Sequence, residues 1–151
     1  MFEALALALA LAQSSPQPIP TPQVLRVTVL RAPRATLRVQ VAQTEPQRER
    51  GLMGVRRLAP HTGMLFVFDS DAPTEFWMKD TLIPLDMVFI SGNGIVRQVF
   101  ANVPVVSTDT SNDRIPRRDG VAKFVLELPA GEALLDGFKA GGLVPGLAPN
   151  R

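Results

Sequence analysis

Apolar and polar residues alternate in several short stretches of the chain, which is the pattern of strands with one buried face. Residues 24–30 place Arg26 between apolar neighbours, and residues 36–42 place Leu37, Val39 and Val41 on one face. A short link that contains an Ala-Pro pair joins the two stretches. The pattern therefore predicts a β-hairpin near the start of the folded chain.

Continuous apolar runs predict further strands that are covered on both faces. Residues 63–68 (GMLFVF) form one such run. Residues 85–90 and 95–100 flank the sequence SGNG, whose glycines and asparagine favour the positive φ of a tight turn, so we expect a second hairpin. Residues 75–78 and 122–128 are also predicted to be strands.

Helical signals are few and short. Thr44 followed three residues later by Gln47 is a capping box, which predicts a helix over residues 45–53. Residues 131–138 are predicted to form one or two helical turns, and the polar residues 107–120 a surface loop. The fold class is therefore a β-rich α+β domain, with a single compact antiparallel or barrel-like sheet and two short helices.

The first residues resemble an export signal. Residues 4–12 alternate Ala and Leu, and Ala-Leu-Ala before Gln13 fits a signal-peptidase site, although Glu3 stands where a signal peptide usually carries a basic residue. Residues 13–23 are proline-rich and uncharged, which predicts an extended linker. We expect a signal peptide over residues 1–12, a single domain over residues 24–151, no membrane span in the mature chain, and a periplasmic or secreted location. A frayed apolar helix is the alternative for residues 4–12.

Composition excludes several kinds of chemistry. The 151 residues include no cysteine, which rules out disulfides, thiolate metal sites and a cysteine nucleophile. The single histidine, His61, rules out a zinc site with several histidines, and we interpret it as a loop residue. Asp69, Asp71 and Glu75 are closely spaced but lack the loop pattern of a calcium module. The sequence thus predicts neither a metal site nor a cofactor.

Charge is unevenly distributed along the chain. Residues 24–57 carry eight arginines and two glutamates, whereas residues 69–86 carry five acids and one lysine. The arginine-rich stretch contains no aromatic residue. This disfavours nucleic-acid binding, because proteins that bind single strands combine basic residues with aromatic side chains on which the bases stack.

Asp86 is a carboxylate inside an apolar run, and it therefore needs a partner such as Lys79 or an arginine. On a functional interpretation, Lys79 with Asp80 or Asp86 forms an acid–base or ligand-holding set beside the apolar wall of Trp77. On the structural interpretation, which we favour, Asp86 accepts hydrogen bonds from backbone N–H groups at the start of a strand.

Two further charged residues, Arg50 and Glu127, have to be placed. Arg50 could clamp an anionic ligand, or it could tie its helix to Asp86 or Glu127 across the core. Glu127 lies between Leu126 and Leu128, so simple alternation places it opposite the core face, where a surface pair with Lys123 is expected.

Four motifs occur in the order ERGLM (residues 49–53), GMLF (63–66), FWMKDT-x-x-PLD (76–86) and VLEL-x-AG (125–131). Together they resemble the domain-of-unknown-function 192 family, over about residues 24–145. The resemblance implies a small β-rich α+β domain, often behind a signal or anchor segment, and no established reaction, cofactor or partner. Asp80 stands where the family usually has asparagine, and Pro129 where it often has asparagine.

The leading hypothesis is an exported binding or accessory module with a polar groove around residues 76–86, whose partner is a small molecule or a protein. The alternative is a hydrolase or lyase acting on an envelope or extracellular glycan, with Asp86 and Glu127 as acid and base. A protein-interaction scaffold is a third possibility. Whether the protein is an enzyme stays open, and no catalytic residue is assigned. The candidate ligand-binding residues are Arg50, Trp77, Lys79, Asp80, Asp86 and Glu127.

Overall fold

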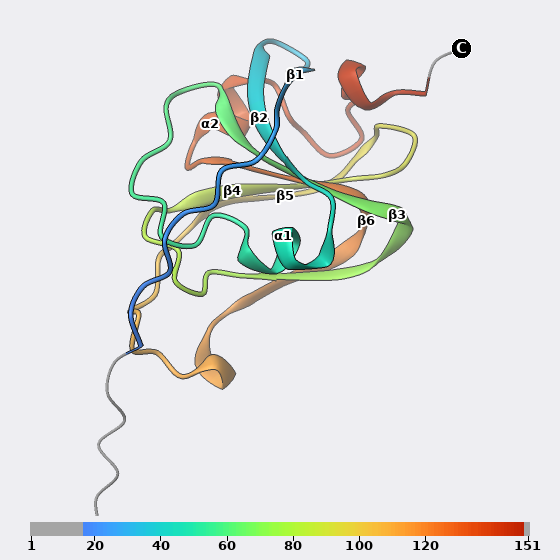
Figure 1. The fold of residues 1–151 in the computed structure, drawn as a ribbon. Helices are drawn as coiled ribbons and strands as arrows, with labels where there is room; N and C mark the ends of the chain where they lie inside the picture. Colours follow the sequence, from blue (N-terminus) through green and yellow to red (C-terminus); the bar gives the residue numbers. More distant parts are fainter. Residues whose placement is uncertain (1–16, 150–151) are drawn as a thin grey trace, which may run out of the picture.

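The computed structural model describes residues 17–149, which form a six-stranded sheet with two short α-helices (Figure 1). The strands are β1 (Val27–Arg31), β2 (Thr36–Ala42), β3 (Thr62–Trp77), β4 (Leu85–Ile90), β5 (Val96–Val103) and β6 (Arg117–Pro129). The helices are α1 (Glu45–Arg50), α2 (Glu132–Leu135) and the 3₁₀ turns η1 (Asn112–Arg114) and η2 (Pro145–Leu147). The predicted signal peptide, residues 1–12, and the start of the predicted linker lie outside the described residues.

The strands are ordered β1-β2-β3-β6-β4-β5 across the sheet. All neighbours are antiparallel except β2 and β3, which run parallel because residues 43–61, with α1, carry the chain back across the domain. The predicted β-rich α+β class with two short helices is confirmed. The sheet is mixed and open, however, with β1 and β5 at its edges. Among residues 17–149, no helix has the length and apolar character needed to cross a membrane.

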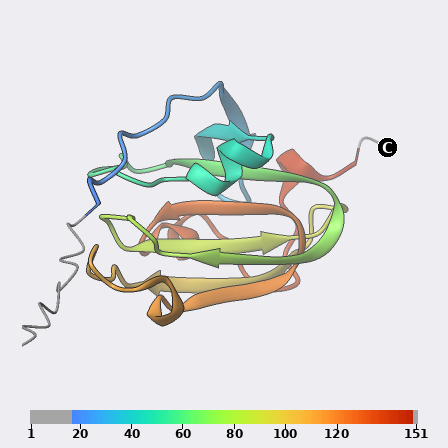
Figure 2. The same cartoon turned by 60° about the horizontal axis from the view of Figure 1, so that its bottom comes forward.

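Strand β3 is much longer than predicted and joins two of the expected strands. Its pairing with β6 shifts register between Val67 and Ala72, and β3 bends there so that its second half returns beneath the first (Figure 2). Strand β6 follows the same bend, which extends it back to Arg117, into the predicted loop. The bent strands enclose a second core on the face of the sheet away from α2.

Both faces of the central strands are therefore buried. One cluster contains Leu37, Val88, Leu126 and Leu128 under α2, and the other contains Met64, Met87 and a chain of phenylalanines. The phenylalanine rings meet edge to face, with centroids 4.8 Å apart for Phe66–Phe76, 5.8 Å for Phe76–Phe89 and 5.5 Å for Phe89–Phe100. Every residue of β4 is buried, as its apolar run predicts.

Helix α1 begins with the predicted capping box and ends earlier than predicted. The Thr44 hydroxyl accepts a hydrogen bond from the Gln47 amide at 3.4 Å, and the Gln47 side chain accepts one from the Thr44 amide at 3.1 Å. Gly51 then adopts φ +44°, which stops the helix at Arg50 and turns the chain into the loop that follows.

The described part of the predicted linker lies against α1. The Gln23 side-chain amide donates to the carbonyls of Gln47 at 2.9 Å and Gly51 at 3.0 Å. Arg50 donates to the Thr21 carbonyl from the same helix. Residues 17–26 contain no helix or strand, yet these hydrogen bonds attach them to the domain.

Gly63 permits a close approach between β3 and β6. A Cβ atom at this position would lie 2.1 Å from the Glu127 carbonyl oxygen, which is backbone and cannot move aside cheaply. We expect Gly63→Ala to lower the free energy of unfolding by about 3 kcal/mol or more, measured by urea denaturation. Gly92→Ala is the control, because its Cβ would meet only movable side-chain atoms at 3.3 Å. Equal stability of both variants would contradict this packing.

Candidate functional site

A pocket of about 340 Å³ opens between α1, the two halves of β3 and the start of the loop before β4. This volume is within the usual range of small-molecule sites, about 300–1,000 Å³. We call it the Glu127 pocket. Its charged and aromatic lining residues are Glu45, Arg48, Glu49, Arg50, Phe66, Phe68, Glu75, Phe76, Trp77, Lys79, Arg117 and Glu127.

Glu127 contributes a buried carboxyl group to this pocket. It pairs with Met64 on β3 and Met87 on β4, and only 4% of the residue is exposed. Burial raises its pKa from 4.5 to about 8, and neither a hydrogen bond nor a neighbouring charge is among the causes of the shift. At pH 7 the group is therefore mostly protonated and can donate a hydrogen bond.

The predicted surface position of Glu127 is wrong. Alternation along β6 correctly places Leu126 and Leu128 in the core on one face. The opposite face is not solvent, however, because the bent halves of β3 and β6 cover it with the second cluster. When both faces of a strand are buried, the alternation of residues no longer separates a core face from a solvent face.

Two basic residues surround the Trp77 ring at the rim of the pocket. The Arg117 guanidinium lies 4.7 Å from the ring centroid and the Lys79 ammonium 5.6 Å, both within cation–π range. Arg117 also pairs with Glu75 at 2.7 Å, and Lys79 donates to the Asn112 side chain at 2.7 Å. Trp77 and these partners hold two cations beside the opening.

Helix α1 adds two arginines to the pocket. Arg48 donates to the Val67 carbonyl at 3.1 Å and lies 4.9 Å from the Phe68 ring centroid. Arg50 donates to the Thr21 carbonyl rather than to Asp86 or Glu127, so of its two interpretations the tie across the core is wrong.

Asp86 has a structural environment on the other face of the sheet. One carboxylate oxygen accepts from the Asn102 amide at 2.7 Å, and the other accepts from the amides of Gly131 at 2.9 Å and Ala133 at 2.8 Å. The residue is fully buried. The favoured interpretation, a carboxylate that satisfies backbone N–H groups, matches this geometry, and among residues 17–149 neither Lys79 nor an arginine is its partner.

The faces of β4 and β6 also separate Asp86 from Glu127. Asp86 pairs with Leu128, whereas Glu127 pairs with Met87, so the two carboxyl groups point to opposite sides of the sheet. They cannot flank one bond of a single substrate, as the acid and base of a glycosidase must.

Of the six candidate ligand-binding residues, four line the Glu127 pocket: Arg50, Trp77, Lys79 and Glu127. Asp80 and Asp86 do not. Asp80 has φ +49°, a conformation that aspartate and asparagine tolerate better than most residues, and its carbonyl accepts from the Gly54 amide at 2.9 Å. Its change from the usual asparagine therefore preserves the backbone of this turn.

Sequence reasoning missed Arg117, because it falls in the stretch predicted to be a loop, and it treated Glu75 only as a possible calcium ligand. Asp69, Asp71 and Glu75, the acids considered for calcium, do not form a ligand cluster in the described part of the chain. Glu75 pairs with Arg117, and Asp71 lies 3.5 Å from Arg97. Sequence reasoning also missed a cluster of His61 with Glu132 and Asp136, which are 71 and 75 residues away along the chain.

The fold and the pocket define a class of small β-rich α+β domain with a charged pocket beside a bent strand pair. The chain belongs to the domain-of-unknown-function 192 family (DUF192, Uncharacterized ACR), whose sequence pattern matches residues 27–145. The predicted resemblance to this family is thereby confirmed.

Two solved structures are similar to this chain. A Sinorhizobium meliloti protein, whose name proposes a role as a transcription regulator, is 35% identical with a TM-score of 0.69, over 79% of this chain and 93% of that one. A protein of unknown function from Novosphingobium aromaticivorans is 27% identical with a TM-score of 0.65, over 81% of this chain and 90% of that one. No match was found among the curated proteins.

Proposed function

We propose that this protein binds a small organic anion in the Glu127 pocket, and that it acts as a binding or accessory module rather than as a carboxylate-pair hydrolase. The observation that carries this proposal is the buried Glu127 side chain, whose pKa burial raises to about 8, in a pocket that is also lined by basic residues. Small-molecule sites typically combine an apolar lining with a few polar groups of this kind.

The charge balance of the pocket favours an anion. Four basic side chains, Arg48, Arg50, Lys79 and Arg117, face three acidic ones, Glu45, Glu49 and Glu75, while Glu127 is neutral below about pH 8. The lining is thus net positive at neutral pH. Lys79 and Arg117 present charged N–H donors at the opening, which suit a carboxylate or phosphate group.

The interior of the pocket selects for the rest of the ligand. Leu52, Phe66 and Phe76 supply apolar surface, and the Glu127 carboxyl donates a hydrogen bond from among them. A ligand that fits has an acidic group for the rim, an apolar or ring portion, and a carbonyl or hydroxyl oxygen that accepts from Glu127.

Binding can be followed by tryptophan fluorescence, because Trp77 is the one tryptophan of the chain and lines the pocket. We expect its fluorescence to change saturably with a member of a panel of short carboxylates, sugar phosphates and nucleoside monophosphates, and not with the uncharged analogue of that compound. Lys79→Ala should weaken binding by about tenfold or more, since a hydrogen bond to a charged group contributes about 1.5–3 kcal/mol. The exposed Lys139→Ala is the matched control.

The ionisation of Glu127 should make the affinity for the anion depend on pH. Above about pH 8 the ionised carboxylate repels an anion and no longer donates, so affinity should fall there in the wild type. Glu127→Gln keeps an N–H donor without the charge and should bind with little change across this range. The proposal is contradicted if no anion in the panel binds, or if Lys79→Ala and Lys139→Ala bind equally well.

A nucleic acid is the competing partner, since the Sinorhizobium meliloti relative is named for regulation of transcription. The arginine-rich stretch lacks aromatic residues, and the described pocket has the size of a small-molecule site. Duplex DNA that bound with a steep salt dependence, and that left Trp77 fluorescence unchanged, would favour that partner instead.

A further inference from the structure

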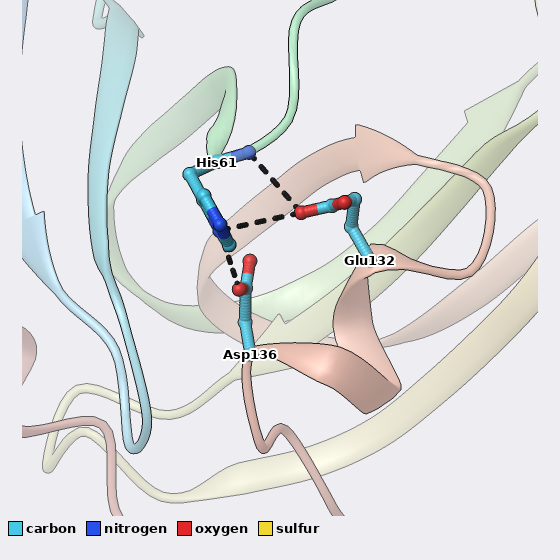
Figure 3. Close-up of side chains that lie close together, drawn as sticks. All are labelled: His61, Glu132 and Asp136. Atoms are coloured by element: carbon cyan, nitrogen blue, oxygen red, sulfur yellow. Dashed lines mark hydrogen bonds and ion pairs between the residues drawn. The ribbon is translucent and has the colours of Figure 1, made fainter.

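A second cluster of ionisable side chains lies on the α2 side of the sheet, away from the Glu127 pocket (Figure 3). His61 comes from the turn before β3, Glu132 begins α2, and Asp136 follows one helical turn later. The His61 Nδ1 atom lies 2.7 Å from Asp136 Oδ1 and 3.4 Å from Glu132 Oε2. One ligand atom from each residue lies within 4.8 Å of the others.

The backbone fixes this arrangement from both sides. The His61 amide donates to Glu132 Oε2 at 3.1 Å, and His61 adopts φ +56°. On the other side, the Asp136 amide donates to the Glu132 carbonyl at 2.8 Å, which places the two carboxyl groups one turn apart on the same face. The exposed fraction of the side chain falls from 53% for His61 to 12% for Glu132 and 1% for Asp136.

Asp136 is the incompletely satisfied member of the cluster. Its Oδ2 atom is buried and has no hydrogen-bond partner among the described residues. A buried acceptor without a partner costs free energy, and it calls for an explanation such as a bound ion. Figure 3 shows the carboxyl group of Asp136 directed into the space beside His61 and Glu132.

We propose that His61, Glu132 and Asp136 bind one divalent transition-metal ion of the Zn²⁺ type. An imidazole nitrogen with two carboxylates is a donor set for such ions, whereas Ca²⁺ and Mg²⁺ select oxygen ligands alone. With His61 neutral, the two carboxylates supply the two negative charges that a divalent ion neutralises.

The spacing of the ligand atoms fits this assignment. A tetrahedral ion with ligand bonds of about 2.1 Å holds its ligands about 3.4 Å apart, which is the distance between His61 Nδ1 and Glu132 Oε2. The shorter contact between Nδ1 and Asp136 Oδ1 is a hydrogen bond that the ion replaces, and Oδ2 can then become a ligand. The exposed side of His61 leaves room for water as the remaining ligand.

The test is a titration of the full chain with ZnCl₂ after EDTA treatment and dialysis. Calorimetry should give one site per chain, and saturating Zn²⁺ should raise Tm by several degrees because the ion binds the native state. His61→Asn, Glu132→Gln and Asp136→Asn should each weaken binding by at least about tenfold, since loss of even an outer-shell partner costs about 10–100-fold. Asp69→Asn, an exposed acid elsewhere, is the control.

His61→Asn keeps the test decisive, because His61 is exposed and its replacement leaves the buried acids in place. X-ray absorption of the Zn²⁺-loaded protein should show one nitrogen ligand of imidazole type with oxygen ligands. The proposal is overturned if millimolar Zn²⁺ neither binds saturably nor shifts Tm, or if a folded His61→Asn binds Zn²⁺ as tightly as the wild type. Either result would make the cluster a structural ion pair.

Discussion

Replacing Glu127 by glutamine is expected to remove most of a loss of stability that the wild-type chain undergoes between pH 4.5 and pH 8. The native state holds the Glu127 proton up to about pH 8, whereas the unfolded chain releases it near the ordinary glutamate pKa of 4.5. Between these values the unfolded state binds fewer protons, so the free energy of unfolding falls as pH rises. The full shift corresponds to a loss on the order of 5 kcal/mol.

The measurement is urea denaturation of both proteins at several pH values from 4 to 9. The wild-type curve should descend relative to the Glu127→Gln curve across this window, and the two should run parallel below it. The raised pKa of Asp136, caused mainly by burial, contributes a change of the same sign to both proteins and cancels in the difference. Glu49→Gln, an exposed acid of the same pocket, should follow the wild type. Parallel curves for the wild type and Glu127→Gln throughout would contradict a protonated Glu127.

Asp86→Ala is expected to destabilise the protein by on the order of 3–5 kcal/mol. The substitution removes a fully buried carboxylate that accepts from the amides of Asn102, Gly131 and Ala133; the hydrogen bond from Ala133 is buried, and the other two are partly buried. Each buried donor that loses its partner costs about 1–3 kcal/mol. Because Gly131 is the N-cap of α2 and Ala133 lies in its first turn, the start of that helix should loosen together with the end of β5.

Hydrogen exchange tests the local part of this prediction and urea denaturation the global part. The amides of Asn102, Gly131 and Ala133 should exchange faster in Asp86→Ala, while those of β2 keep their order of protection. Asp69→Ala removes an exposed carboxylate from β3 and should change stability by less than about 0.5 kcal/mol. A cost for Asp86→Ala as small as that for Asp69→Ala would show that these hydrogen bonds do not stabilise the fold.

The sequence was sufficient to predict the elements whose stabilising contacts are local. Strands β2 and β4 have the predicted bounds, and both hairpins form at the predicted turns. In each case alternation, an apolar run or a turn residue acts within about ten positions of the element it specifies. The capping box of α1 belongs to the same group.

Elements that depend on distant partners could not be predicted in full. Residues 69–74 (DSDAPT) have weak strand preference, and the strand continues through them to residues 72–74, which pair with β6 beyond the register shift. The parallel pairing of β2 with β3 likewise depends on where the intervening loop returns the chain. No local sequence pattern predicts the extension of β3 or its parallel pairing with β2.

The candidate site follows the same division. Trp77 and Lys79 were found because they are close together in one motif, and Arg50 because its guanidinium group lies on a predicted short helix and can clamp an anion. The buried state of Glu127 depends on the bend of β3 between Val67 and Ala72, 55 to 60 residues away along the chain, so alternation alone placed it on the surface. The His61 cluster has no sequence signature, since His61 lies in the turn before β3 whereas Glu132 and Asp136 lie in and directly after α2, 71 and 75 residues further along the chain.

The most direct test of a neutral carboxyl group in the pocket is the pKa of Glu127 itself. Carbon NMR of protein labelled with ¹³C-glutamate, with the Glu127 resonance assigned by its absence in Glu127→Gln, follows this carboxyl group through its titration. We expect a midpoint near pH 8, well above the 4.5 of a glutamate without this burial. A midpoint near pH 4.5 would mean that Glu127 is charged at neutral pH, and it would contradict the proposed anion site.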